Sequence, residues 1–148
     1  MTHALDDYSS GEALVETIVK TATNYNVGNV SRGKWGVLNT GKSATYAILK
    51  PGGSVRVYEQ SYTNHITIIE VWQRYTTDGD TLTALEGNTA QIIAKLDGSP
   101  TLGDTKDEII DSNVRDWSEV KDMWRKGGGP AWLRQDINFI WIEQHNVR

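Results

Sequence analysis

The segment His65–Tyr75, HITIIEVWQRY, constrains the fold of this chain more than any other. A β-strand places successive side chains on opposite faces of its sheet. Ile66 and Ile68 fall on one face, while Ile69 and Val71 fall on the other. Because both faces are apolar, this segment is predicted to be a central strand that is covered on both sides.

A second segment near the C-terminus, Trp132–Gln144, repeats this pattern. Ile137, Phe139 and Trp141 share one face, and the intervening residues, including Ile140, share the other. The same period of two predicts a second long strand. We expect the two segments to be neighbours in one sheet.

Two helices are predicted from capping signals and apolar spacing. Ser9 and Glu12 have the spacing of a capping box, and apolar residues then recur at helical intervals, which predicts a helix over about 10–24. Asp80 is a plausible N-cap for the second helix. Gly98, followed by Pro100, marks its end.

The remaining strands are predicted from shorter patterns. Lys50–Ser54, KPGGS, carries turn residues between Ala44–Leu49 and Val55–Glu59, which favours a β-hairpin. Ile109–Val114 is expected to form a short edge strand, and Glu119–Lys126 alternates enough for another.

The expected fold class is α+β, with two helices packed on a largely antiparallel twisted β-sheet. At 148 residues the chain has the length of a single domain, spanning 1–148, with a flexible N-terminus over 1–8. We find no internal repeat and no linker between two cores.

Charge and composition argue against several classes of protein. A net charge of −4 and a pI of about 5.3 argue against a basic nucleic-acid-binding surface. The chain has no cysteine, so it has neither a disulfide framework nor a thiolate site. No apolar run is long enough to span a membrane, and the N-terminus lacks the pattern of a signal peptide.

One segment, Gly36–Ser43, matches the phosphate-binding pattern G-x-x-x-x-G-K-[ST]. That chemistry needs a buried strand before the loop and a helix after it. Asn26–Lys34 is not an apolar strand, and Ala44–Leu49 is β-prone and soon meets Pro51. A small NTPase is therefore retained only as a minor alternative.

No other pattern points to a reactive centre. His3, His65 and His145 lack metal-ligand spacing, although His65 could meet Glu59 or Glu70 in space. Paired carboxylates lie in polar surface stretches, where nothing raises a pKa for acid catalysis. We expect no catalytic, cofactor-binding or metal-binding residue, and therefore no enzyme.

Apolar and acidic side chains in loops are instead candidates for contacts with partners. The long Asn26–Ser43 loop is one candidate patch, because long loops in compact domains are usually functional. The acidic Leu102–Asp116 loop is placed beside it as a second hypothesis. Large aromatic residues often anchor interfaces. The candidate interface residues are Trp35, Val37, Leu38, Leu102, Asp104, Asp107, Trp124 and Trp132.

The order of these elements resembles the tail terminator, or tail completion, proteins of tailed bacteriophages, which join the tail to the head. The resemblance spans Ser10 to Gln144 and includes the segments YAILKPGG, LEGNTAQIIAKLDG and SPTLGD. It rests on the order of the elements and on the general character of the sequence, not on an invariant residue signature. The Asn26–Ser43 loop and the triple-glycine turn Gly127–Gly129 depart from it.

The resemblance implies a structural protein of the virion tail and neck, assembled in the host cytoplasm. Such proteins form a homo-oligomeric ring, usually a hexamer, that caps the tail tube and stops its polymerisation. The implied partners are the tail tube protein and a connector or stopper protein on the head side, while DNA only passes through the lumen. The alternative is a monomeric α+β module that binds a ligand or a partner.

Overall fold

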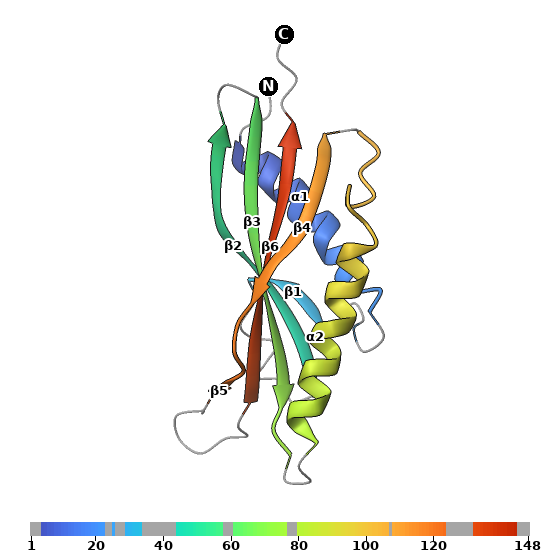
Figure 1. Ribbon diagram of the computed structural model, residues 1–148, viewed down its shortest axis with the longest axis vertical. Helices are drawn as coiled ribbons and strands as arrows, with labels where there is room; N and C mark the ends of the chain where they lie inside the picture. The colour runs from blue at the N-terminus through green and yellow to red at the C-terminus, as the bar shows by residue number, and fades with distance from the viewer. Residues whose placement is uncertain are drawn as a thin grey trace.

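Strands dominate the structure, a computed structural model that describes residues 4–22, 25, 29–33, 44–57, 61–76, 80–106, 108–123 and 132–144. Three of the strands have 13 residues each (Figure 1). In chain order the elements are α1 (Ala4–Val19), β1 (Val30–Arg32), β2 (Thr45–Val57), β3 (Tyr62–Arg74), α2 (Thr81–Asp97), β4 (Ile109–Trp117), β5 (Lys121–Met123) and β6 (Trp132–Gln144).

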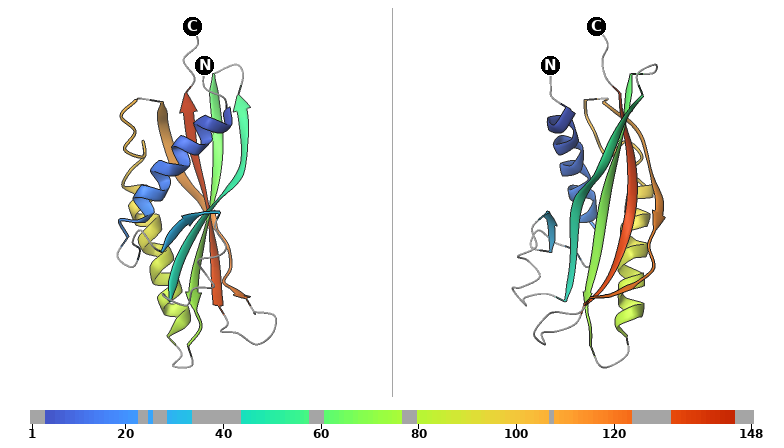
Figure 2. Two further views of the ribbon diagram at one scale, coloured as in Figure 1. Left: turned by 180° about the vertical axis from the view of Figure 1, so that it is seen from behind. Right: turned by 90° about the vertical axis from the view of Figure 1, so that its left-hand side faces the viewer.

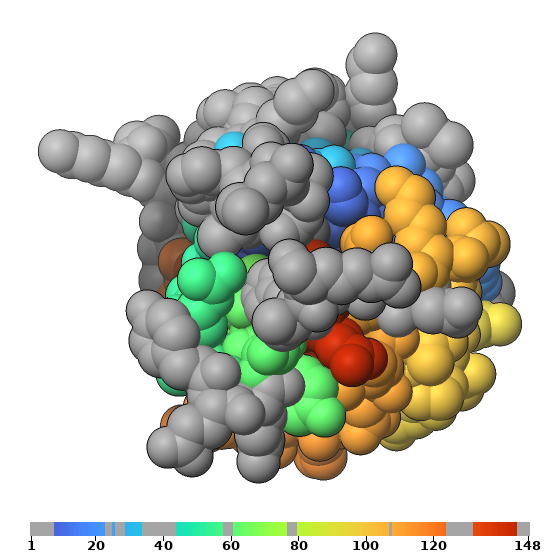
Figure 3. Space-filling model, turned by 90° about the horizontal axis from the view of Figure 1, so that it is seen from above, coloured from blue at the N-terminus to red at the C-terminus, as the bar shows by residue number. Residues whose placement is uncertain are grey.

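The described strands form one six-stranded sheet with the order β1-β2-β3-β6-β4, in which β5 also pairs with β6. β1 runs parallel to β2, whereas the other pairs are antiparallel. The sheet twists strongly along its length (Figure 2). Seen from above, β2, β3, β6 and the segment around β4 lie side by side in this order (Figure 3).

The main core lies between one face of this sheet and both helices. Ile69 of β3 and Phe139 of β6 are fully buried there, as the period of two predicts. Val15 of α1 and Leu85 and Ile92 of α2 belong to the same cluster. Figure 2 shows α1 crossing this face obliquely.

The opposite face carries a smaller cluster of Tyr46, Ile48, Trp72 and Trp132. The rings of Trp72 and Trp132 meet edge to face with centroids 6.4 Å apart. Away from this cluster, Ile66 and other aliphatic side chains of this face are only partly buried. No described helix covers this side of the sheet, so the expectation of full cover on both faces of β3 holds only where the aromatic cluster lies.

The prediction of an α+β fold class is wrong. The structure is mostly β, with 50% strand and 27% helix, and its sheet is mixed because β1 runs parallel to β2. The physical reason is that segments expected as turns continue as strands. The pairing of β3 with β6 along their whole length confirms that the two apolar segments are neighbours.

The predicted hairpin over 44–59 is also wrong, because Pro51-Gly52-Gly53 forms a bulge instead of a turn. β2 runs through this segment, and the partner residues shift between Pro51 and Ser54. Gly53 has a φ of +106°, which a glycine tolerates and which lets the strand bend without reversing.

Helix boundaries agree with the sequence for α2 and differ for α1. α2 begins after Asp80 and ends before Gly98 as predicted, although Asp80 makes no side-chain capping bond. α1 begins at Ala4, six residues earlier than expected, and includes part of the predicted flexible N-terminus. Neither α1 nor α2 has both the length and the apolar character that crossing a bilayer would need, among the residues described.

Candidate functional site

Few of the predicted interface residues are displayed on the described surface. Trp35, Val37, Leu38, Asp107 and Trp124 lie outside the described residues. Leu102 and Trp132 are buried within the subunit, where Leu102 joins the main core and Trp132 joins the aromatic cluster. Contacts of these positions with a partner stay a prediction.

Asp104 organises the loop between α2 and β4. Its carboxylate accepts backbone N–H groups of Glu108 at 2.8 Å, Ile109 at 3.1 Å and Lys106 at 3.2 Å. Partial burial acts to raise the pKa of Asp104, but these three donors outweigh burial and lower the pKa below its usual range. The loop is therefore held by a charged side chain at its centre.

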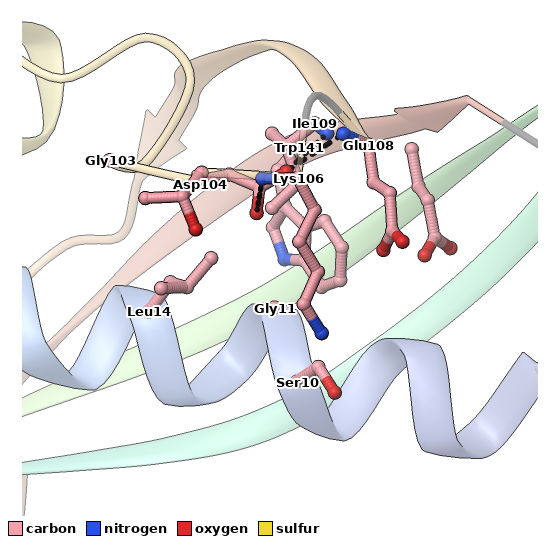
Figure 4. Close-up of a pocket in the computed structure, with 11 residues that line it drawn as sticks. Ser10, Gly11, Leu14, Gly103, Asp104, Lys106, Glu108, Ile109 and Trp141 are labelled. Carbon is pink, nitrogen blue, oxygen red and sulfur yellow. Dashed lines mark hydrogen bonds between the residues drawn. The ribbon is translucent and has the colours of Figure 1, made fainter.

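This loop forms one wall of a cleft of about 290 Å³ whose other walls are α1 and β6. In Figure 4 the Lys106 side chain extends across the cleft toward α1, while Asp104 turns back to its own loop. Gly11 lets α1 approach the sheet closely, because a Cβ there would stand 2.1 Å from the ring of Trp141. The cleft is polar at its rim and closed by this indole at its base.

A polar cluster joins β2, β3 and β6 near this cleft, and all of it except the exposed Ser54 is buried. His65 is only 1% exposed, and its Nδ1 lies 2.6 Å from the Ser54 hydroxyl. Its Nε2 lies 3.0 Å from Oε1 of Glu143, which is also buried. Because a carboxylate only accepts, Nε2 carries the proton, and Nδ1 of a neutral ring then accepts from Ser54.

A second set of contacts ties α1 to the same end of the sheet. The Tyr8 hydroxyl donates to Glu12 at 2.6 Å and lies 3.2 Å from the hydroxyl of Thr67. Trp141 donates its indole N–H to Thr67 at 3.0 Å, and Arg32 pairs with Glu12 at 2.9 Å. Burial, followed by the hydrogen bond to Glu12, holds the pKa of Tyr8 well above its usual range.

The order of hydroxyl, imidazole and carboxylate is that of a nucleophilic relay, yet this geometry favours a structural role. The imidazole of His65 is sealed among Tyr8 and Trp141, with ring centroids at 5.6 and 4.2 Å. The Ser54 hydroxyl is on an exposed residue, but the buried imidazole cannot pass a proton on to a leaving group. Its bonds hold three strands together, and the neighbouring Tyr8 adds α1.

Sequence reasoning allowed His65 to meet Glu59 or Glu70 and missed Glu143; Glu59 lies outside the described residues. Glu143 shares the inward face of β6 with Phe139 and Trp141. The alternation of inward and outward residues along this segment could therefore have identified Glu143 as a buried partner. Glu70 lies instead on the opposite face, where Lys50 pairs with it at 3.0 Å.

Charged side chains continue across that opposite face from β2 to β5. Arg134 lies 3.7 Å from Glu70 and 3.0 Å from Asp136, and Lys121 lies 3.2 Å from Asp136. Arg134 also stands 5.5 Å from the ring centre of Trp72. Such alternating pairs fix neighbouring strands relative to one another but contribute little stability singly where they reach solvent.

The sheet has two open edges in the described part of the chain. β1 covers only Ala47–Leu49 of β2, so no described strand lies outside the second half of β2. β4 ends the sheet on the other side. Val55 at the first edge is 61% exposed, and Ile110 at the second is 38% exposed.

The phosphate-binding pattern Gly36–Ser43 lies outside the described residues, but the segment after it is informative. The chain continues as strand β2 from Thr45, so no helix begins there to face a phosphate. Within the described residues, no group of three His, Cys, Asp or Glu side chains is arranged to hold a metal ion.

Comparison with protein-family models and with curated proteins finds no match for this chain. The open edges of the sheet and the order of the elements are therefore the features that bear on its function.

Proposed function

We propose that this chain is a non-enzymatic structural subunit that assembles head to tail into a ring, as the tail terminator of a tailed bacteriophage. The order of helix, long strand, helix and long final strand supports the proposal, because the resemblance to that family rests on it. The hairpin at YAILKPGG, which also belonged to the resemblance, is a continuous strand and gives no support. The ring would belong to the tail and neck of the virion.

The observation that carries the proposal is the pair of open sheet edges on opposite sides of one subunit. The second half of β2 and the whole of β4 have no described strand beyond them, and each exposes an aliphatic side chain, Val55 or Ile110. Exposed edges of this kind are templates for strand addition. Two different edges make a heterologous contact, which closes into a ring when the rotation per subunit allows it.

Strand direction decides how these edges can meet. β2, β3, β6 and β4 alternate in direction, so β2 and β4 run antiparallel within the subunit. Consider a neighbouring subunit that is related to the first by rotation about an axis parallel to the strands. The β4 strand of this neighbour then runs antiparallel to β2 of the first subunit. The sheet would then continue across the contact with the pairing that most of its own strands use.

Bulges restrict this pairing to a short, defined register. The bulge at Gly52-Gly53 bounds the edge of β2 on one side, and register shifts fall next to Ile110 and Arg115 in β4. A regular run remains at Ser54–Val57 and at Asp111–Val114. Short edges interrupted by bulges resist open-ended aggregation while leaving room for one specific partner.

The proposed ring acts through the shape of its two faces and catalyses no reaction. One ring face would match the last layer of tube subunits, and the other would present a docking surface to the head connector in place of a further tube layer. The net charge of −4 supports a lumen that does not retain DNA, because like charges repel.

Light scattering after size-exclusion chromatography tests this proposal on the purified chain, alone and with tail tube protein. We expect a discrete oligomer, either alone or on addition of tube protein. A chain that stays monomeric in both samples would contradict the ring and favour the alternative, a monomeric partner-binding module.

A further inference from the structure

Strand alternation determines which backbone groups of β2 face its open edge. Along an antiparallel strand, the N–H and C=O groups of successive residues point to opposite neighbours in turn. In the first half of β2, the N–H of Ala47 and the C=O of Leu49 bond at 2.9 Å to residues that flank β1. Odd-numbered residues of this half therefore point away from β3, and even-numbered residues point toward it.

The bulge at Gly52-Gly53 reverses this alternation in the open half of β2. The register shifts by one residue there, while β3 pairs with β6 without a break and keeps its own alternation. Ser54 therefore directs its N–H and C=O groups at the open edge, whereas Val55 faces β3. The 2.6 Å bond between the Ser54 hydroxyl and His65 supports this assignment, because it places the Ser54 side chain on the helix-bearing face, as for Ala47.

The same alternation applies to β4 at the other edge. Val114 lies opposite Phe139, and Phe139 is one of the odd-numbered residues of β6 that face β3. Ser112 and Val114 therefore direct their backbone groups outward. The N–H of Ser112 is held at 2.9 Å by the carboxylate of Asp111, whereas no described side chain or loop bonds to the N–H of Val114.

The regular runs at the two edges have equal lengths. β2 is regular over Ser54–Val57, where the strand ends, and β4 is regular over Asp111–Val114, between its two register shifts. A shift by one residue between these runs would oppose edge-directed groups to groups that point inward. A shift by two would leave half of each run paired and carry the rest into a bulge. One antiparallel register pairs both runs completely, and in it Ser54 lies opposite Val114.

We propose that the edge of β2 binds β4 of a second copy of this chain in this single register, in which Ser54 and Val114 exchange both backbone hydrogen bonds. No described side chain or loop bonds to either N–H, so this exchange breaks no such bond within the subunit. On the helix-free face, Val55 then lies opposite Asn113 of the second copy. The register rests on the proposed ring, and it adds which residues meet, which the open edges alone do not determine.

Amide hydrogen exchange with single-residue resolution tests this register on the dilute subunit and on the oligomer, formed alone or with tail tube protein. The amides of Ser54 and Val114 should exchange rapidly in the subunit and at least about tenfold more slowly in the oligomer, because each gains a hydrogen bond. The Val55 amide faces β3 and should change little. Rapid exchange at Ser54 or Val114 in a formed oligomer would overturn the register and leave the ring. Absence of any oligomer would overturn both.

Disulfide formation between positions on the helix-free face distinguishes the registers. Val55→Cys with Asn113→Cys matches the proposed register. Val55→Cys with Asp111→Cys, and Val57→Cys with Asn113→Cys, match the two shifts by two residues. Positions that are two residues out of register lie about 7–8 Å apart, too far for an unstrained disulfide, so only the first pair should link. Preferential linking of a shifted pair would overturn the register without contradicting the ring.

A matched pair of variants at Ser54 separates the backbone donor from the side chain. Ser54→Ala and Ser54→Pro both lose the hydroxyl that bonds to His65, but only proline also removes the N–H at the edge. Proline is accepted in an edge strand where the N–H would face solvent, so both chains should fold. Ser54→Pro should associate at least about tenfold more weakly than Ser54→Ala. Equal association of the two folded chains would overturn the proposal.

Discussion

At the scale of single residues, Gly11 sets the distance between α1 and the sheet. A methyl group at this position would stand 2.1 Å from the Trp141 ring, and that ring is fully buried and packed against His65. Overpacking of this kind typically costs about 1–3 kcal/mol. We expect Gly11→Ala to lower the free energy of unfolding by at least that amount, measured by urea denaturation.

Gly87 of α2 provides the matched control, because the same substitution meets open space there. No atom lies within 4 Å of the Cβ that would be added. Alanine in a helix interior is favoured over glycine by about 1 kcal/mol, so Gly87→Ala should stabilise the chain. Equal effects of the two variants would mean that α1 does not press on Trp141.

Asp104 makes stability depend on pH. Its pKa is lowered in the folded state from 3.8, so its contribution is present above that value and is lost as the pH falls through the folded pKa. Asp104→Asn should reduce unfolding free energy by about 1 kcal/mol at neutral pH. The difference from the natural chain should shrink in acid.

Asp122→Asn serves as the comparison for Asp104, because this carboxylate is exposed on β5. It should change stability by less than about 0.5 kcal/mol. If the effect of Asp104→Asn were the same at pH 7 and at pH 3, the loop would not be held by the ionised carboxylate. Denaturant titrations at the two pH values decide this.

Residue alternation revealed which side chains are buried but not which polar groups meet. Ile137, Phe139 and Trp141 were correctly placed on one face of the last strand. The bond between His65 and Glu143 joins residues 78 apart in the chain, and no local pattern encodes the pairing register that brings them together.

At the scale of elements, the bulge in β2 determines how long the central strands can be. Proline followed by two glycines is typical of a turn. The apolar strand β3, however, is long enough to pair with β2 on both sides of Pro51. Tertiary pairing therefore overrides the local turn preference. For the same reason the strand at β4 extends to Trp117, beyond the short edge strand that was predicted.

Gly53 tests the role of this bulge. Its φ of +106° is unfavourable for any residue with a Cβ, although no neighbouring atom would clash. We expect Gly53→Ala to cost about 1–2 kcal/mol through backbone strain alone. Alanine would be strained in a tight turn as well as in a bulge, so a loss of stability alone does not distinguish the two. Circular dichroism and the hydrogen-exchange protection of the Ser54–Val57 amides should therefore be measured together with the denaturation curve. Loss of protection confined to this run would locate the strain in β2.

Helix boundaries could be predicted where local signals and tertiary packing agree. α2 has a stop at Gly98 and an apolar stripe, and both are reproduced in the structure. α1 extends back to Ala4, and Tyr8 within this extension is buried against Thr67 and Trp141. Those contacts depend on the assembled sheet, so the capping signal at Ser9 could not reveal them.

At the scale of the whole molecule, both helices lie on one face of the sheet, and the described residues of the other face carry a small aromatic cluster and charged pairs. Sequence patterns predicted two helices and the long strands but not the proportion of strand, because turn-like residues such as Pro51–Gly53 became part of the sheet. The candidate surfaces for assembly depend on strand order, which alternation alone does not determine. They could be found only once β4 was placed outside β6.

Cysteine cross-linking across the two open edges tests the proposed ring most directly, because the natural chain has no cysteine. Val55 and Asn113 both lie on the helix-free face, opposite Asn64 and Ile140. Oxidation of the Val55→Cys, Asn113→Cys double variant should give a ladder of linked chains that stops at one largest species, the closed ring. Val55→Cys combined with Thr83→Cys, which is exposed on α2, should form no such ladder. A Val55, Asn113 double variant that remains a single chain after oxidation would contradict the account.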